Sequence, residues 1–263
     1  MKNSSASHID YSRYFSLKQK AFLINMSEGR DREQYESLSG FIVNRYQDII
    51  ELQIPYAIGL ELPDASKKIE YKISTEAFGM GLQMIAELVT VKGNIFQLQL
   101  RDNLEIYQRR QTVRIDTTIK LFHARQNFPL TFYRKEFKRV MDYMKAQGLP
   151  SNLKFQELAV NLSVGGIRLA VEPQEQPSPL SMFFIDLDGK LPPVLAVAES
   201  AWEHQEGKLL LCGHRFIHIL KADQERINRY VQAIQKERGI QVLAPKTNWD
   251  LLDRMSMEGP EKK

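Results

Sequence analysis

The chain has 263 residues, of which 43% are hydrophobic, so it is long enough for two modest domains and too apolar for a disordered protein. Its 36 Lys and Arg residues against 32 Asp and Glu residues leave a net charge of +4, which suits a small anionic ligand or an acidic protein surface better than long duplex DNA. The single cysteine, Cys212, excludes an intrachain disulfide and fits a reducing compartment.

The N-terminal part of the chain predicts no targeting or membrane segment. Residues 1–13 are polar and lack the apolar core of a signal peptide, and no apolar run approaches the ~20 residues that a membrane span needs. We therefore expect a soluble cytoplasmic protein. Residues 9–25 mix aromatic residues with Lys and Ser and predict a helix that packs through one apolar face, with a docking segment as the alternative.

Residues 27–36 are charged and indicate a linker or a helix start. From Gly40 the pattern becomes typical of strands, with turns at residues 63–65 and 92–93. The predicted strands are residues 49–55, 57–62, 69–73, 82–91 and 94–100. Five short strands at this spacing predict a small antiparallel β-barrel, and nothing in it is catalytic in type or spacing.

A basic loop follows the first barrel. Arg109, Arg110 and Arg114 form a run without a carboxylate, directly before a strand that alternates apolar and polar residues to about Ala124. A guanidinium can grip a phosphate with two hydrogen bonds or lie flat on a base, and it keeps its charge at physiological pH. The loop therefore indicates an anion site, although a solvated basic turn is the commoner role of such a run.

Next comes a predicted helix at about residues 130–148. Phe132, Phe137, Val140, Met141 and Met144 recur at helical spacing, basic residues occupy the remaining positions, and Gly148 and Pro150 end the pattern. We expect the helix to pack on the barrel. A basic face that docks on a partner or a membrane surface is the alternative.

A second polar motif, Asn161-Leu162-Ser163-Val164-Gly165-Gly166, follows about fifty residues after the basic loop. Asn161 and Ser163 are two apart on an extended chain and so point to the same side. Gly165 and Gly166 let the backbone approach a ligand where a Cβ atom would clash. Alone, such a motif is most often an ordinary polar turn.

The remaining pattern predicts a second barrel and a C-terminal helix. Strands are predicted at residues 153–162, 166–171, 180–187, 194–203 and 208–219, which gives six strands with the one that follows Arg114. Residues 223–237 predict a helix with Asp223 as its N-cap and Gly239 as its stop. The fold class is thus mainly β, with two successive antiparallel barrels, an inserted helix and a C-terminal helix.

Other candidate chemistry is weak. Cys212, His214 and His218 fall on one side of the last predicted strand, but no third ligand stands at a usable metal-binding spacing, so we interpret them as packing residues. No phosphate loop is present. We expect neither a metal, nor a resident cofactor, nor an enzymatic activity.

The two motifs, in this order within one domain-sized stretch, resemble the signature of the PilZ family of cyclic di-GMP receptors. That signature is Arg-x-x-x-Arg ahead of a barrel and Asp/Asn-x-Ser-x-x-Gly on a barrel strand, here Arg110, Arg114, Asn161, Ser163 and Gly166. The preceding residues 40–107 resemble the N-terminal domain of YcgR-type flagellar brakes. The inserted helix departs from the family pattern.

The resemblance implies a domain organisation and a function. It implies an N-terminal segment (1–35), a YcgR-like barrel (36–106), a PilZ domain (107–240) that begins with a basic hinge loop (107–114), and a tail (241–263). It implies a ligand site for cyclic di-GMP at Arg109, Arg110, Arg114, Asn161, Ser163, Gly165 and Gly166. In the family a long basic residue at the place of Arg109 accompanies binding of an intercalated ligand dimer.

By the same resemblance, binding reorients the barrels, and the partner is a flagellar motor component at the basal body. Two alternatives stay open: a ligand-independent scaffold protein of a motility or secretion machine, and a barrel that binds single-stranded RNA. The second lacks an exposed aromatic platform in its sequence pattern.

Overall fold

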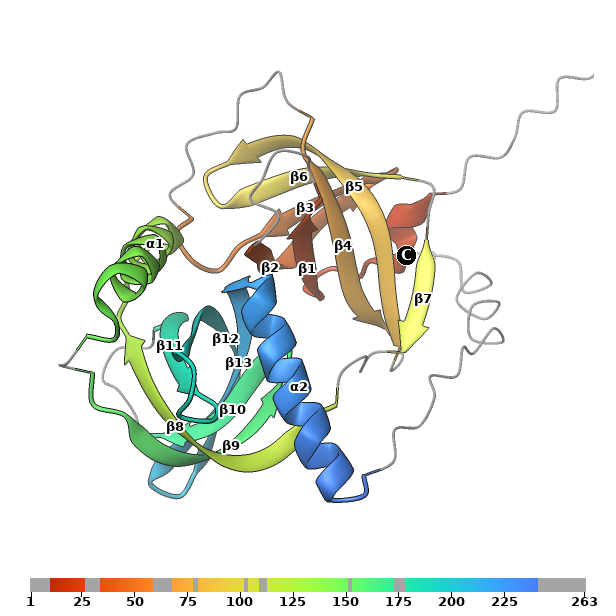
Figure 1. The fold of residues 1–263 in the computed structure, drawn as a ribbon. Helices are drawn as coiled ribbons and strands as arrows, with labels where there is room; N and C mark the ends of the chain where they lie inside the picture. The colour runs from red at the N-terminus through yellow and green to blue at the C-terminus, as the bar shows by residue number, and fades with distance from the viewer. Residues whose placement is uncertain are drawn as a thin grey trace, which may run out of the picture.

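The first half of the chain forms a closed antiparallel barrel of six strands (Figure 1). The computed structural model describes residues 10–26, 34–58, 68–77, 80–101, 104–108, 113–150, 153–172 and 178–240. The barrel order is β1-β4-β5-β6-β3-β2, and pairing of β1 with β2 closes it. The strands are β1 (Lys20–Asn25), β2 (Gln34–Tyr46), β3 (Ile49–Gln53), β4 (Glu70–Ala77), β5 (Met80–Lys92) and β6 (Ile95–Leu100).

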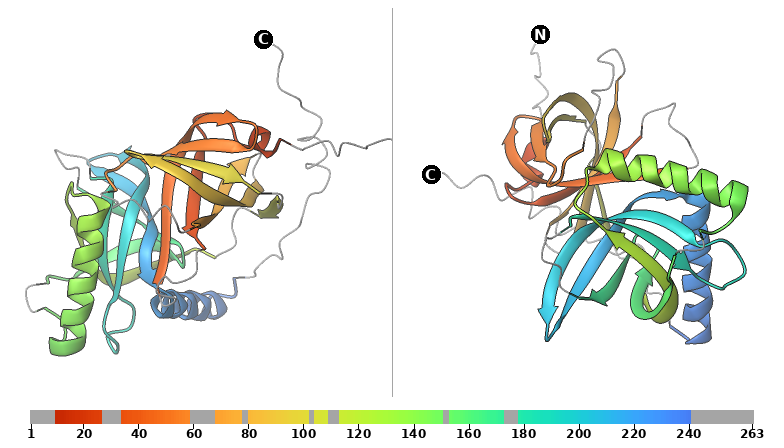
Figure 2. Two further views of the ribbon diagram at one scale, coloured as in Figure 1. Left: turned by 90° about the horizontal axis from the view of Figure 1, so that it is seen from above. Right: turned by 90° about the vertical axis from the view of Figure 1, so that its left-hand side faces the viewer.

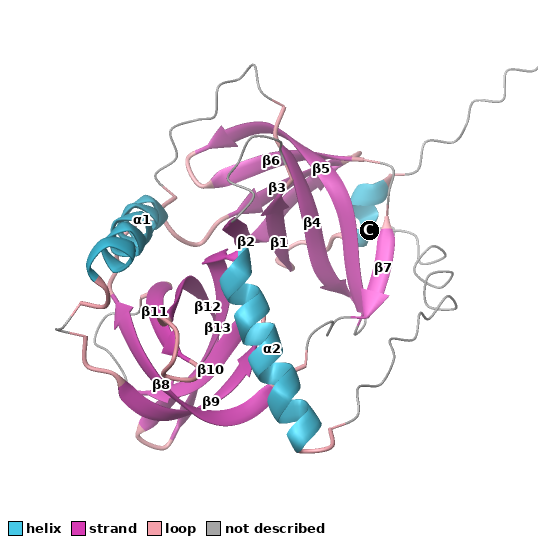
Figure 3. Cartoon of the chain, in the orientation of Figure 1, coloured by secondary structure: helices cyan, strands magenta, loops and turns pink. Residues whose placement is uncertain are grey.

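The second half forms another closed antiparallel barrel of six strands. Its order is β13-β10-β9-β8-β11-β12, and pairing of β12 with β13 closes it. The strands are β8 (Ile115–Arg125), β9 (Gln156–Ser163), β10 (Gly166–Val171), β11 (Leu180–Asp186), β12 (Val194–Glu206) and β13 (Leu209–Leu220). The predicted fold class, mainly β with two barrels and two helices, is confirmed (Figure 3).

The two helices attach to the second barrel on different sides. Helix α1 (Leu130–Gln147) packs on β11 and β12 through Leu130, Tyr133 and Phe137, which are buried. Helix α2 (Lys221–Glu237) packs on β8, β9 and β13, and Ile227 and Val231 complete the core of the second barrel. Figure 2 shows α1 on one flank of the molecule and α2 along another side of the second barrel.

Both predicted helices exist, but one predicted cap is wrong. Helix α2 begins at Lys221 with Leu220 as its N-cap, so Asp223 lies in the first turn. Its carboxylate accepts a hydrogen bond from Arg226 at 2.8 Å instead of capping the helix. Gly239, at φ +63°, follows the end of α2 as predicted.

The N-terminal prediction is also wrong. Residues 11–14 form only a short 3₁₀ turn, η1 (Tyr11–Tyr14), and β1 then begins at Lys20, where Ala21 and Leu23 point into the first barrel. Strand β2 begins at Gln34, inside the stretch predicted as a linker. Ala57 and Ile58, predicted to start a strand, have no regular structure, and the rest of that predicted strand lies outside the described residues.

The barrels are joined through a shared sheet and a shared apolar cluster. Strand β2 of the first barrel pairs with β13 of the second through the partners Glu36 and His218, and Leu220 and Gln34. The apolar cluster inside the first barrel continues through α1 onto the outer faces of β11 and β12. The two barrels therefore fold against each other as one packed unit.

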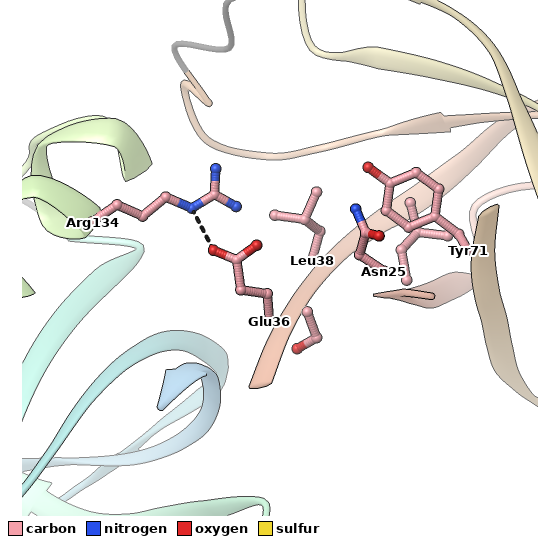
Figure 4. A pocket seen from close by; sticks show the side chains of 7 residues that line it. Asn25, Glu36, Leu38, Tyr71 and Arg134 are labelled. Atoms are coloured by element: carbon pink, nitrogen blue, oxygen red, sulfur yellow. Dashed lines mark ion pairs between the residues drawn. The ribbon is translucent and has the colours of Figure 1, made fainter. Parts of the chain in front are cut away.

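Polar groups are buried at this junction as well. Glu36 forms an ion pair with Arg134 of α1, with 3.2 Å between Nε and Oε1 (Figure 4). The same Oε1 lies 3.1 Å from Nδ1 of His218. Glu199 of β12 is only 1% exposed and accepts a hydrogen bond from the Tyr56 hydroxyl at 2.9 Å. Glu36 thus contacts residues of both α1 and β13, and Glu199 is held by a residue that follows β3 of the first barrel.

The connection between the barrels starts from a further strand, β7 (Glu105–Gln108), which pairs with β5. The basic loop therefore leaves the first barrel at Gln108, one residue later than the predicted hinge begins, and enters β8 at Ile115. None of the helices in the described ranges is long and apolar enough to cross a membrane.

Candidate ligand-binding site

The Asn-x-Ser-x-x-Gly motif forms the hairpin between β9 and β10. Ser163 pairs with Gly166 across the turn, and Asn161 pairs with Arg168. Val160 and Leu162 point into the core of the second barrel. Because side chains alternate along a strand, Asn161 and Ser163 share one side, as predicted from their spacing, and this is the outer face, where Asn161 is half-buried and Ser163 is buried.

The end of the basic loop reaches the same face. Strand β8 pairs with β9 so that Asp116 lies opposite Asn161 and Ile115 opposite Leu162. The ladder ends at Ile115 and Leu162, so Arg114 and Ser163 each adjoin its last pair. Ile115 is in the core, so Asp116 is on the outer face, and Arg114, which precedes the strand, is exposed. Arg109 and Arg110 lie outside the described residues.

Asn161 and Ser163 thus share one face of β9, and the exposed Arg114 directly precedes β8, the strand paired with β9, at the end of the loop that carries the other two arginines. We call this group the candidate site. Its members hold local partners: Asn161 donates to Asp116 Oδ1 at 2.8 Å, and the Ser163 hydroxyl lies 3.3 Å from the Gly166 carbonyl oxygen. Their role in ligand binding stays a prediction.

A hollow of about 430 Å³ lies beside the candidate site, over β8, β9 and β10. Arg168 donates to Asp116 Oδ1 at 3.1 Å, and Arg238, just after α2, donates to the Asp116 backbone carbonyl at 2.6 Å. Asp116 thus accepts from two guanidiniums, from Arg168 at its exposed carboxylate and from Arg238 at its backbone carbonyl. The volume of the hollow falls in the range of about 300–1,000 Å³ that is usual for small-molecule pockets.

The two glycines of the motif have different surroundings. A Cβ atom at Gly166 would lie 2.2 Å from the His214 carbonyl oxygen, so this glycine is required by the neighbouring strand β13. A Cβ atom at Gly165 would meet nothing within 4 Å. Protein packing therefore explains Gly166, and the close approach of a ligand stays a prediction for Gly165.

Arg215 is a neighbour of the site that the sequence analysis missed. It pairs with Gly166 on one side and with Glu199 on the other, so it continues the outer-face row that starts at Ser163. Arg168 is two residues after Gly166 on β10, so alternation of side chains along that strand could have indicated it from the sequence. Only the strand register reveals Arg215, and only the helix packing reveals Arg238.

The cysteine and histidines of β13 are buried, in agreement with their interpretation as packing residues. Cys212 and His214 face the interior of the second barrel, where burial, with Arg125 and His123 nearby, lowers the pKa of His214 to about 3. His218 lies on the opposite side, against Glu36 and Phe137, because a bulge interrupts the β12–β13 register. The prediction that all three share one side is therefore wrong.

No protein-family model matches the sequence, and no curated protein matches it either. Among solved structures, the inhibitor of motility MotI/DgrA of Bacillus subtilis is 12% identical, with 87% of this chain and 100% of that chain covered and a TM-score of 0.35. YcgR of Escherichia coli in complex with c-di-GMP is 13% identical, with 83% and 85% covered and a TM-score of 0.30.

A tetrameric PilZ domain from Xanthomonas campestris is 14% identical, with 50% of this chain and 92% of that chain covered and a TM-score of 0.34. The similar solved structures are PilZ-domain proteins. The function proposed below rests on the residues of this chain.

Proposed function

We propose that this protein is a cyclic di-GMP effector whose second barrel binds the messenger and whose shape then changes. One observation carries the proposal: β8 pairs with β9, so the exposed Arg114 directly before β8 lies next to the end of β9 that carries Asn161 and Ser163. The shared face of Asn161 and Ser163 follows from strand alternation, whereas the nearness of the basic loop to them depends on the β8–β9 pairing.

The chemistry of these groups fits the ligand. Cyclic di-GMP has two phosphates, and each guanine presents O6 and N7 as adjacent acceptors that match a guanidinium. Arg110 and Arg114 would supply phosphate and guanine contacts, and Asn161 and Ser163 would contact the opposite guanine and its phosphate. A bidentate arginine–guanine contact contributes about 1–3 kcal/mol. A few such contacts, less the cost of association, reach the ~8 kcal/mol of micromolar binding.

The position of the loop supports a shape change. It leaves the first barrel from β7, which is paired with β5, and enters the second barrel at β8. A ligand that holds Arg109, Arg110 and Arg114 would therefore fix the chain between the barrels and alter their relative orientation. By the family resemblance, the reoriented protein acts on a flagellar motor component and so regulates motility.

Titration calorimetry with cyclic di-GMP tests the proposal. We expect the wild type to release heat with micromolar affinity and a stoichiometry of two ligands per chain, because Arg109 favours an intercalated dimer. Arg110→Ala and Arg114→Ala should each weaken binding by at least tenfold. The control is Arg139→Ala, which removes an exposed guanidinium that pairs with Glu136 on α1, far from the site along the chain.

Equal binding by the wild type, Arg110→Ala and Arg114→Ala would contradict the site. Absence of binding to the wild type would contradict the effector proposal and favour the ligand-independent scaffold. One ligand per chain would contradict only the role of Arg109.

A further inference from the structure

A row of residues runs across the outer face of the second barrel, from the candidate site to the first barrel. Ser163 of β9 pairs with Gly166 of β10, Gly166 pairs with Arg215 of β13, and Arg215 pairs with Glu199 of β12. Paired residues on neighbouring antiparallel strands point to the same face. The row therefore connects a ligand motif with a buried part of the junction between the barrels.

The far end of the row is fixed to the first barrel. Glu199 accepts a hydrogen bond from Tyr56 at 2.9 Å, and its Oε1 lies 3.9 Å from Nζ of Lys20. Burial lowers the pKa of Lys20, the nearby Glu199 carboxylate opposes this shift, and the charge of Arg215 adds to it. Arg215 is thus close enough to this cluster for its charge to act on Lys20.

The middle of the row contacts the first barrel directly. The Arg215 guanidinium carbon lies 3.8 Å from the centroid of the Phe22 ring, and Phe22 belongs to β1. Both side chains are half-buried. A guanidinium over an aromatic face is a favourable contact, and it can be exchanged for an equivalent contact with another flat ring or with an anion.

Gly166 lies between Ser163 and Arg215 in the row and contributes no side chain to it. Adjacent strands lie about 4.8 Å apart, so Ser163 is roughly two strand spacings from Arg215. The residue between them has no side chain, and His214 and Arg215 backbone atoms would crowd any Cβ atom there. Nothing from β10 therefore stands in the row between the Ser163 hydroxyl and the Arg215 guanidinium.

We propose that Arg215 is a further ligand-binding residue of this site, and that it exchanges the Phe22 ring of the first barrel for a guanine or phosphate of the bound cyclic di-GMP. This inference rests on the proposed function and adds the route by which the site communicates with the first barrel. In the free protein Arg215 ties β13 to β1. In the bound protein that tie is released, because the guanidinium turns from the Phe22 ring towards the ligand.

The exchange predicts opposite effects for the two partners. Arg215→Ala removes a ligand contact and should weaken cyclic di-GMP binding at least tenfold. Phe22→Leu removes the competitor of the ligand and should tighten binding about threefold. In the double variant the gain from Phe22→Leu should vanish, because no guanidinium is left to release. A purely structural role of the pair would not produce tightening.

Titration calorimetry on the full chain measures these affinities, with far-UV circular dichroism to establish that each variant is folded. Arg215→Lys keeps the charge and loses the flat guanidinium, so it should fall between the wild type and Arg215→Ala. Phe41→Leu, at an exposed ring on β2, and Arg101→Ala, at an exposed guanidinium of the first barrel, are the controls and should bind as the wild type does.

The outcomes separate the two proposals. Binding by the wild type with unchanged affinity in Arg215→Ala overturns this inference and leaves the proposed function intact. Weaker binding by Phe22→Leu also overturns it, because the ring would then assist the ligand. No binding by the wild type overturns both. If Arg215→Ala does not fold, tighter binding by Phe22→Leu and weaker binding by Arg215→Lys than by the wild type support the inference. The absence of either result overturns it.

Discussion

At the scale of single residues, the two adjacent glycines of the motif give a matched pair for substitution. Gly166→Ala places a methyl group 2.2 Å from the His214 carbonyl oxygen, so β10 and β13 must separate locally. Overpacking of this kind costs about 1–3 kcal/mol. We expect chemical denaturation to show a loss of this size in the free energy of unfolding, together with weaker cyclic di-GMP binding.

Gly165→Ala is the control, because its methyl group meets nothing within 4 Å. Its unfolding free energy should stay within about 0.5 kcal/mol of the wild type, as for most surface substitutions. Equal destabilisation by both variants would contradict the packing explanation for Gly166. Weaker ligand binding by Gly165→Ala at unchanged stability would support the predicted ligand approach at this position.

His214 predicts a dependence of stability on pH. Its ring packs on Phe183 with 5.1 Å between ring centroids, and burial, Arg125 and His123 lower its pKa to about 3. In the unfolded chain a histidine has a pKa of about 6.5, so between these two values the unfolded state binds more protons. The contribution of His214 to stability is therefore complete above about pH 6.5 and is lost as the pH falls towards 3.

Denaturation at pH 7 and pH 4.5 tests this dependence. His214 should account for roughly 2–3 kcal/mol of the acid-induced loss of stability, because each pKa unit corresponds to about 1.4 kcal/mol. His214→Gln should remove that share of the slope, whatever its effect at pH 7. The exposed His204 gives the control, and His204→Gln should keep the wild-type slope. Parallel slopes for all three proteins would contradict a buried neutral His214.

At the scale of elements, α1 links the two barrels through one buried face. Phe137 is 1% exposed, and its ring lies 4.4 Å from the His218 ring, between centroids, at the β2–β13 junction. Truncation of a core phenylalanine costs about 3–5 kcal/mol. Phe137→Ala should lower the unfolding free energy by that amount. Phe132→Ala, on the same helix at 38% exposure, should change it by less than about 1 kcal/mol.

Equal effects of these two substitutions in chemical denaturation would contradict the packing of α1 seen here. The comparison also bears on the alternative that α1 docks on a partner through its basic face. The buried residues Leu130, Tyr133 and Phe137 agree with the expected packing role, and the exposed basic residues stay available for that alternative.

The elements also show what sequence patterns can and cannot predict. The sequence predicts strand β10 at its observed bounds and helix α1 to within one residue, because alternation starts at a glycine in one and helical spacing ends at Gly148 in the other. Strand β2 is not among the predicted strands, although a strand-like pattern is recognised from Gly40, since Ser37 and Ser39 occupy buried positions where apolar residues are expected. The pattern over β1 indicates a helix instead, because the aromatic residues around it obscure the alternation of Ala21 and Leu23.

The candidate site likewise has one part that the sequence predicts and one part that only the structure reveals. Asn161 and Ser163 follow from alternation along one strand, which is a local property of the sequence. The neighbourhood of Ser163, Gly166, Arg215 and Glu199 depends on the register of four strands, and residues from 163 to 215 must fold before it exists. Arg215 carries no sequence signal of its own, so only the structure could indicate it.

At the scale of the whole molecule, the proposed reorientation has to act against a firm junction. Strands β2 and β13 are hydrogen-bonded, the apolar cluster of the first barrel continues onto the outer faces of β11 and β12, and Glu199 is buried with Tyr56 as its partner. A ligand can shift this arrangement only by as much as it binds the reoriented form more tightly than the observed one. Release of Arg215 from Phe22 would remove one of the contacts that hold the observed form.

A disulfide across the junction tests whether reorientation accompanies binding. Gln34 and Leu220 are register partners on β2 and β13, and cross-strand partners lie within disulfide reach, so Gln34→Cys with Leu220→Cys should lock the barrels when oxidised. We expect cyclic di-GMP to change the small-angle scattering profile of the wild type and of the reduced variant. In the oxidised variant the profile should stay constant and affinity should fall, because the reoriented form cannot be populated. Cys212 is buried, so the oxidised wild type serves as the control. An unchanged scattering profile of the wild type at saturating ligand would contradict the reorientation and leave the binding proposal intact.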